Sequence, residues 1–357
     1  MNNLLNFLKI NIVLGLIITL SFNDFFPLWV GMEMISLLIM GMIFLKKATG
    51  IGGIGFQKFG VLIKYMFLQI FSGMIILFSF SLSNLLLDFS KMGLNLGLHT
   101  QYYGINMIME MFSFMFIFSI ALKLGLFPGH LWVVDVFSGL TFHECFILGT
   151  IPKYAPFLLL NGDYCESNNL LMLLGGLSIL LGSFQGLNYS DMRQIMGGSS
   201  IMNTGWLMLG FLFGGLNMFF MMYLIYSYTL WVLFNLIRVL NIQTLGAYKT
   251  WFSYTDKMLF SFAIFIMMGM PCGVMFFYKI FLIMGSNNVS LFFFLMLSGY
   301  TMFVFYSRMM SQVWNYDFFG VMFLYTSVNR FGMSVNKYIT SLVTLFFPGM
   351  VILFKFL

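Results

Sequence analysis

Residues 105–137 read INMIMEMFSFMFIFSIALKLGLFPGHLWVVDVF, and this stretch decides the fold. It stays apolar for longer than the roughly 20 residues that a helix needs to cross a bilayer. Gly125, Pro128 and Gly129 interrupt it directly after Lys123. The stretch therefore predicts a helix that is broken inside a membrane. A break frees backbone groups that protein or water must satisfy, and water beside a lysine is what a proton path requires.

A second stretch, residues 258–283, repeats this pattern as MLFSFAIFIMMGMPCGVMFFYKIFLI, with breaks at Gly269, Pro271 and Gly273 directly before Lys279. The two stretches are the fourth and ninth predicted spans, so they run through the membrane in opposite directions. Corresponding interrupted helices in two halves are typical of inverted-repeat transporters, whose ion path passes the breaks. The alternative is that proline and glycine are simply common in membrane helices. A lysine beside each break favours the functional interpretation.

The composition indicates the same class of protein. Charged residues make up 8% of the 357-residue chain and hydrophobic residues 61%, whereas an ordinary soluble domain is about 25% charged. We expect an all-α polytopic membrane protein, with one transmembrane domain over residues 1–357. Apolar runs predict about eleven spans, within a range of ten to twelve: 4–22, 27–45, 59–83, 105–137, 139–160, 169–187, 197–214, 218–240, 258–283, 290–308 and 339–356.

The predicted spans divide into two inverted halves, residues 4–160 and 169–308. Residues 309–338 contain an apolar patch that is too short and too punctuated to span, so they predict a connection or a surface helix. A twelfth span in this segment is the alternative. Residues 339–356 predict a final transmembrane helix.

Basic residues in the connections divide unevenly between the two sides of the membrane. If the chain has eleven spans, most basic residues of the connections lie on the same side of the membrane as residue 1. Only Lys91 and Lys355 lie on the other side. Basic residues accumulate on the side from which a protein is inserted, so we expect the N-terminus in the matrix or cytoplasm and the C-terminus opposite. The net charge of +6 then reflects topology, and no nucleic-acid partner is expected.

The N-terminal segment has neither a basic region with a cleavage site nor an Arg/Ser-rich amphipathic presequence. It predicts a retained first helix and a chain made in the compartment where it works. The 47 phenylalanines and 33 methionines fit an AT-rich organelle genome.

Cofactor and metal motifs are missing from the sequence. Cys145, Cys165 and Cys272 form no C-x-x-C pair, and no glycine-rich dinucleotide fingerprint follows a strand. The pair His143–Glu144 begins like H-E-x-x-H, but Ile147 stands where the second histidine is required. We therefore expect no cofactor and no metal in this chain.

Eight ionisable residues fall inside or near the ends of predicted spans. Such groups are costly in hydrocarbon and persist mainly where they are paired, hydrated or useful, so function is sought among them: Lys9, Glu33, Lys64, Glu110, Lys123, Glu144, Lys153 and Lys279. Lys153 lies near the middle of its span between Pro152 and Pro156, and a buried lysine can carry a proton.

Residues 123–157, KLGLFPGHLWVVDVFSGLTFHECFILGTIPKYAPF, resemble a signature of the chain 2 family of NADH:ubiquinone oxidoreductase, respiratory complex I. The family pattern is K-L-G-x-x-P-F-H-x-W-x-P-D-V-x-x-G-x-P, followed by a helix that ends in P-K-x-A. Departures are Gly129, Val134 and Thr141. The matching positions are Lys123, Gly125, Pro128, His130, Trp132, Asp135, Val136, Gly139, Lys153 and Ala155.

Four further stretches resemble the same family, in the family's order, between about residues 27 and 280. LWVGMEMISLLIM places Glu33 at the family's helix-borne glutamate. LIKYMFLQIFSG is similar to K-Y-F-L-x-Q at Lys64, Tyr65 and Gln69. NYSDMRQIMGGSSIMNTGWLMLG is similar to K-R-L-x-A-Y-S-S-I-x-x-x-G. GMPCGVMFFYK is similar to G-x-P-P-x-x-G-F-x-x-K, with Cys272 and Met275 as departures.

The resemblance implies an antiporter-like, proton-translocating subunit in the mitochondrial inner membrane, in the shortened form that lacks the first three helices of the long bacterial form. It implies other membrane-arm subunits as partners, including antiporter-like chain 4 and small membrane subunits, besides membrane lipids. FMN, iron–sulfur clusters, NADH and ubiquinone would belong to other subunits.

The resemblance also implies roles for particular residues. Glu33 and Lys123 would form an ion pair at the entry, Lys153 would be the central relay and Lys279 the exit-side relay. The alternative for Glu33 and Lys123 is an ion pair with only a structural role. The alternative for Lys279 and Lys64 is a long side chain that extends along the helix and places its ammonium group at the membrane surface. His130 and Trp132 would connect the break to water or only cap the half-helix, and Asp135 would end that half-helix.

Two other functions remain open from the sequence. A stand-alone cation/proton antiporter would share the breaks and the lysines but would work without the complex. A structural membrane scaffold would make the buried lysines dispensable.

Overall fold

The computed structural model describes residues 2–22, 24–48, 55–94, 102–161, 168–239, 242–245, 254–270, 273–285 and 289–315. Pro271, most of the predicted connection at 309–338 and the predicted last span at 339–356 lie outside these residues. Every regular element within them is a helix, apart from an isolated bridge between Asp191 and Thr244. The fold of the described chain is therefore all-α, as the composition predicts.

The helices in chain order are α1 (Asn2–Ser21), α2 (Phe25–Ala48), α3 (Gly55–Leu94), α4 (Tyr102–Leu124), α5 (Leu131–Ser138), α6 (Phe142–Leu160), α7 (Asn168–Asn188), α8 (Met192–Val239), α9 (Tyr254–Met268), α10 (Val274–Met284) and α11 (Val289–Asn315). Six of the described helices contain an apolar stretch long enough to cross a membrane, so the chain has the character of a multi-pass membrane protein.

Both interrupted stretches are discontinuous in the structure. The first separates α4 from α5, and Gly125 at the break has a φ of +70°. The second separates α9 from α10, and Gly269 has a φ of +78°. Side chains disfavour this left-handed backbone conformation, whereas glycine adopts it freely.

A third glycine marks the junction between the predicted spans 197–214 and 218–240. The structure runs both spans together as α8, but Gly215 inside it has a φ of 63° and a ψ of −162°. The long element is therefore two helices that meet at a kink.

Several helix ends differ from the predicted spans. α3 begins before residue 59 and continues beyond residue 83, and α11 continues to Asn315. Residues 309–315 are thus helical rather than the start of a connection. Asp135 lies within α5 and does not end it. Polar residues can continue a helix beyond an apolar run, because intrahelical hydrogen bonds do not require apolar side chains.

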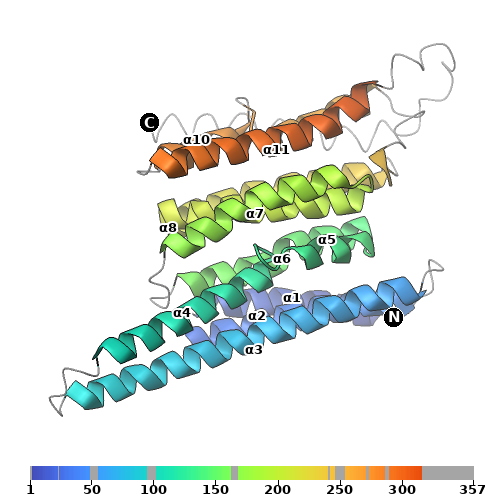
Figure 1. Cartoon of the computed structure of the whole chain (residues 1–357). Helices are drawn as coiled ribbons and strands as arrows, with labels where there is room; N and C mark the ends of the chain where they lie inside the picture. The colour runs from blue at the N-terminus through green and yellow to red at the C-terminus, as the bar shows by residue number, and fades with distance from the viewer. Residues whose placement is uncertain are drawn as a thin grey trace. The chain divides into compact units, whose positions relative to one another are not determined.

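The chain forms two compact units: residues 1–140 with 147–178, and residues 141–146 with 179–357. In the first unit α2 packs against α1 and α3, and α3 runs alongside α4 (Figure 1). In the second unit α9 packs against α8 and α11, and α10 packs against α8 and α9.

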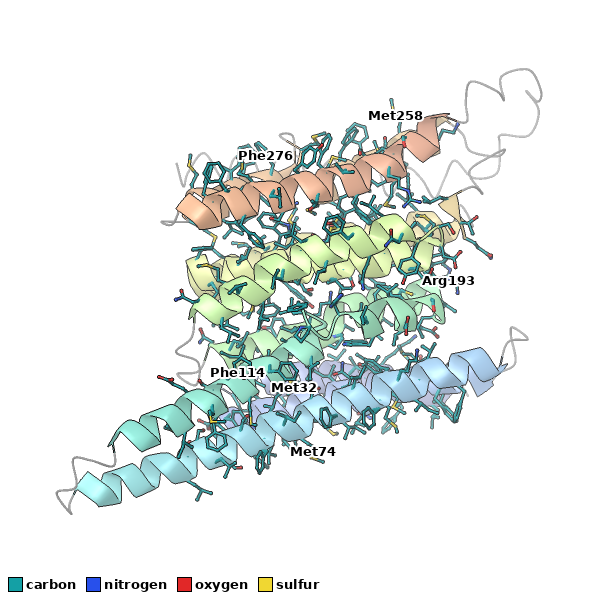
Figure 2. The ribbon with its side chains drawn as sticks, in the orientation of Figure 1. Met32, Met74, Phe114, Arg193, Met258 and Phe276 are labelled. Atoms are coloured by element: carbon teal, nitrogen blue, oxygen red, sulfur yellow. The ribbon has the colours of Figure 1, made fainter. Side chains whose placement is uncertain are left out.

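Large apolar side chains are found on both the inner and the outer faces of the helices. Met32 is buried, whereas Met74 on α3 and Phe114 on α4 are more than half exposed and project from their helices (Figure 2). Large exposed apolar surfaces are rare on soluble monomers. This surface suits contact with lipid or with other membrane proteins.

Candidate functional site

A buried ion pair joins two helices of the first unit. The ammonium group of Lys123, near the end of α4, contacts the Glu33 carboxylate on α2. The Lys123 side chain is 2% exposed and that of Glu33 is 16% exposed. The Ser36 Oγ, one helical turn further along α2, donates a hydrogen bond to the main-chain carbonyl oxygen of Glu33 at 2.8 Å. The predicted partners are therefore in direct contact.

One face of α3 packs against this ion pair. A Cβ atom on Gly73 would collide with the Glu33 carboxylate, so the carboxylate would have to move if a larger residue stood at this point. The indole nitrogen of Trp29 donates to the Gly73 carbonyl oxygen at 2.9 Å. Trp29 and Gly73 were not predicted as site residues, and no motif in a single sequence would have indicated them.

The break after Lys123 is held by hydrogen bonds to the last carbonyl groups of α4. Gly125 donates its N–H to the Leu122 oxygen at 3.2 Å, and Leu126 donates to the Ala121 oxygen at 2.8 Å. The Trp132 indole nitrogen also donates to the Leu122 oxygen, at 3.1 Å. Trp132 therefore fastens α5 to the end of α4, which is the capping role weighed from the sequence.

His130 lies at the start of α5 and is buried. Its Nδ1 lies 3.2 Å from the carbonyl oxygen of Pro128, two residues earlier. This contact within the turn helps to fix the chain direction between α4 and α5.

Lys64 and Asp135 form a second ion pair in the first unit, with 2.7 Å between Lys64 Nζ and Asp135 Oδ2. Their side chains are 58% and 51% exposed. An exposed pair contributes about 1 kcal/mol or less. It is separate from the buried pair and links α3 to α5.

Lys153 is buried near the middle of α6, and the neighbouring Pro152 and Pro156 lie inside the same helix. Because proline has no N–H, each removes one intrahelical hydrogen bond. Lys153 therefore lies in a part of α6 where main-chain carbonyl oxygens lack their usual intrahelical N–H donors.

In the second unit Lys279 on α10 is buried and reaches the end of α9. Its Nζ donates to the carbonyl oxygens of Met267 at 3.2 Å and Met268 at 3.1 Å. The Trp206 ring on α8 lies 5.5 Å from the Nζ, measured to the ring centroid. The buried ammonium thus lies at the carbonyl end of α9. The Lys279 side chain therefore does not extend to the membrane surface, which was the alternative considered from the sequence. Trp206 was not predicted.

Gly269 permits this arrangement. A Cβ atom there would lie 3.0 Å from Lys279 Nζ, which is tighter than ordinary contact. Pro271, predicted at the same break, lies outside the described residues.

Glu144 serves the local structure of α6. Its Oε2 accepts a hydrogen bond from the Thr141 N–H at 2.9 Å, three residues earlier. This is the reciprocal half of a capping box at a helix N-terminus.

A model of the transmembrane family described as NADH:quinone oxidoreductase/Mrp antiporter matches residues 22–305. The chain belongs to this family. The match includes Glu33, Lys123, Lys153 and Lys279 as well as both helix breaks.

Curated relatives in the family carry the name NADH-ubiquinone oxidoreductase chain 2. The chain is 34% identical to that of Patiria pectinifera over 207 residues, which covers 57% of this chain and about half of the relative, 53%. It is 29% identical to that of Albinaria caerulea over 324 residues, covering 90% of this chain and 89% of the relative.

Solved structures with low sequence identity share the fold. A chain of respiratory complex I from Thermus thermophilus matches with a TM-score of 0.73 at 18% identity, covering 96% of this chain and 77% of that one. A chain of the Mrp complex from Dietzia sp. DQ12-45-1b matches with a TM-score of 0.69 at 14% identity, covering 86% and 60%.

Proposed function

We propose that this chain is a proton-translocating membrane-arm subunit of a mitochondrial NADH:ubiquinone oxidoreductase. The support is the family, the name that its relatives carry, and buried lysines at two helix breaks. The chain would take part in the enzyme as a subunit without a redox centre, coupling electron transfer elsewhere in the complex to proton movement.

The observation that carries the proposal is the contact between Lys123 and Glu33. The carboxylate compensates the charge of the buried ammonium, and a buried charge without its partner is strongly destabilised. A conformational change that separates the two groups would therefore drive Lys123 to release its proton. The break at Gly125 directly follows Lys123, where freed polar groups can support water.

We propose that Lys153 is the central relay and Lys279 the exit-side relay. Lys153 lies buried between two helix prolines, and Lys279 donates to the last carbonyl groups of α9. Each can gain and lose one proton without changing any bond other than N–H. In this proposal Glu33 and Lys123 form the entry.

The proposed topology has eleven spans in two inverted halves, residues 4–160 and 169–308. The N-terminus would lie in the matrix and the C-terminus in the intermembrane space, with protons moving from matrix to intermembrane space. The uneven distribution of basic residues between the predicted connections supports this orientation. The chain would be encoded in the organelle.

The proposed partners are other membrane-arm subunits, among them antiporter-like chain 4 and small membrane subunits, together with membrane lipids. NADH, FMN, iron–sulfur clusters and ubiquinone would be bound by other subunits. The stand-alone cation/proton antiporter considered from the sequence is not favoured, because the curated relatives carry the name of an NADH-ubiquinone oxidoreductase subunit.

Replacing Lys153 with alanine tests the proposal. In the assembled complex, Lys153→Ala should lower proton pumping and NADH:ubiquinone turnover by about a hundredfold, the lower end of the range for losing a proton-transfer group. Lys9→Ala, which removes an exposed lysine of α1, should leave both rates near wild type. Unchanged pumping in the Lys153→Ala complex would indicate a scaffold.

A further inference from the structure

Three residues of α3 lie on one face of the helix at intervals of four: Tyr65, Gln69 and Gly73. Residues four apart on a helix are neighbours on the same side. Tyr65 is 1% exposed and Gln69 is 3% exposed. This face is therefore directed into the first unit.

The same face contacts both the ion pair and the break. Gln69 Nε2 lies 3.4 Å from the carbonyl oxygen of Lys123, and Gly73 adjoins the Glu33 carboxylate. The Tyr65 ring lies 5.9 Å from that of Trp132, measured between centroids.

Two polar atoms on this face lack a hydrogen-bond partner among the described residues: the Tyr65 hydroxyl and Gln69 Oε1. A carbonyl oxygen can only accept, so the Gln69 amide must turn its NH₂ toward Lys123 and its oxygen elsewhere. Buried polar atoms are nearly always hydrogen-bonded, often to an internal water that bridges several of them. Two such atoms one helical turn apart, beside an ion pair, meet the polar requirement for a water site.

We propose that Tyr65 and Gln69 hold a water molecule beside the Glu33–Lys123 ion pair, and that this water exchanges protons with Lys123. The inference rests on the proposed function. The water donates a hydrogen bond to Gln69 Oε1 and shares one with the Tyr65 hydroxyl. When Lys123 releases its proton, the water accepts it and gives up one of its own protons toward neutral Lys153, the proposed central relay. When neutral Lys123 is reloaded, the water donates a proton to it and takes one from water on the entry side, so only N–H and O–H bonds change. Tyr65 and Gln69 are positioning residues.

Tyr65→Phe tests the water site, because it removes the hydroxyl and keeps the ring that faces Trp132. Tyr228→Phe is the matched control, since Tyr228 on α8 carries another buried hydroxyl without a partner among the described residues. Both variants are compared with wild type in the assembled complex, reconstituted in liposomes. The readouts are NADH-driven proton pumping and the ratio of turnover in H₂O to that in D₂O.

Tyr65→Phe should slow pumping roughly tenfold, the effect on a rate of losing about one hydrogen bond. It should also raise the H₂O/D₂O ratio, because proton transfer at Lys123 becomes limiting. Tyr228→Phe should change neither value. A Tyr65→Phe complex with wild-type pumping and a wild-type ratio overturns the water site, and so does slowed pumping with an unchanged ratio, which indicates a packing role.

Lys123→Met separates failure of this inference from failure of the proposed function. If Lys123→Met abolishes pumping while Tyr65→Phe does not slow it, only the water site is wrong. If Lys123→Met also pumps normally, both proposals are wrong. Should Tyr65→Phe prevent assembly, a water-resolving map of the wild-type complex decides: a peak within hydrogen-bond distance of the Tyr65 hydroxyl and Gln69 Oε1 supports the site, and its absence overturns it.

Discussion

Two lysine–carboxylate pairs of the first unit show how burial changes the meaning of the same contact. The exposed pair of Lys64 and Asp135 is screened by its surroundings and contributes little to stability. The pair of Lys123 and Glu33 is buried, and removal of either partner from such a pair costs about 3–5 kcal/mol. The buried pair therefore fixes α4 against α2 more strongly than the exposed pair fixes α3 against α5.

The close contact between Gly73 and the Glu33 carboxylate predicts the effect of replacing Gly73. Gly73→Ala adds a methyl group that collides with the carboxylate, so Glu33 must move relative to Lys123. We expect a severalfold or greater loss of NADH-driven pumping, as about 1 kcal/mol already changes a rate about fivefold.

Gly60→Ala on the same helix is the control, because a Cβ atom there meets no atom within 4 Å. Alanine is also the better helix former, by about 1 kcal/mol. Gly60→Ala should therefore assemble and pump as wild type does. Equal pumping by the two variants would contradict the tight packing of Gly73 against Glu33.

At the scale of helices, the breaks are the features that sequence predicts best. Glycine and proline within an apolar stretch longer than one span indicate a break with a physical cause. Capping of α4 by Trp132 was one of two roles that the sequence left open, whereas Lys279 as the partner of the carbonyl groups at the end of α9 could not be predicted. Their positions depend on the direction in which the chain leaves the break.

The break between α9 and α10 gives a second glycine prediction. Gly269→Ala places a side chain in a left-handed conformation, which costs about 1–2 kcal/mol, and brings a Cβ atom within 3.0 Å of Lys279 Nζ. The ammonium must then give by a few tenths of an ångström, which would weaken its hydrogen bonds to the Met267 and Met268 carbonyl groups, so pumping should fall severalfold while the complex assembles.

Gly299→Ala in α11 is the matched control, because nothing lies within 4 Å of a Cβ atom there. Pumping and the amount of complex should both stay at wild-type values. If Gly269→Ala also pumps normally, contact between Lys279 and the end of α9 has no part in proton movement.

The candidate site was predictable in its charges but not in its surroundings. Glu33, Lys123, Lys153 and Lys279 stand out because charges are rare in apolar spans. Tyr65 and Gln69 match the K-Y-F-L-x-Q pattern, but neither they nor Gly73 were predicted as site residues, because their contacts depend on how α3 is rotated toward α2 and α4. The spans predicted from the apolar runs were also shorter than α3 and α11, because helical turns with polar residues extend these helices beyond the hydrophobic stretch.

At the scale of the whole molecule, the exposed apolar side chains of the described helices agree with a chain surrounded by lipid and other membrane proteins. The composition predicts this surface, because so few charges cannot cover a water-soluble protein. Which proteins lie against it depends on contacts outside the chain. Membership in a proton-pumping NADH:ubiquinone oxidoreductase is therefore the claim that most needs a direct measurement.

That measurement is native electrophoresis of the source membranes in mild detergent, with an in-gel stain for NADH oxidation and mass spectrometry of each band. We predict that peptides of this chain are found in the large band that oxidises NADH, together with other membrane-arm subunits. Peptides confined to a small band without NADH oxidation would contradict the account and favour a stand-alone antiporter.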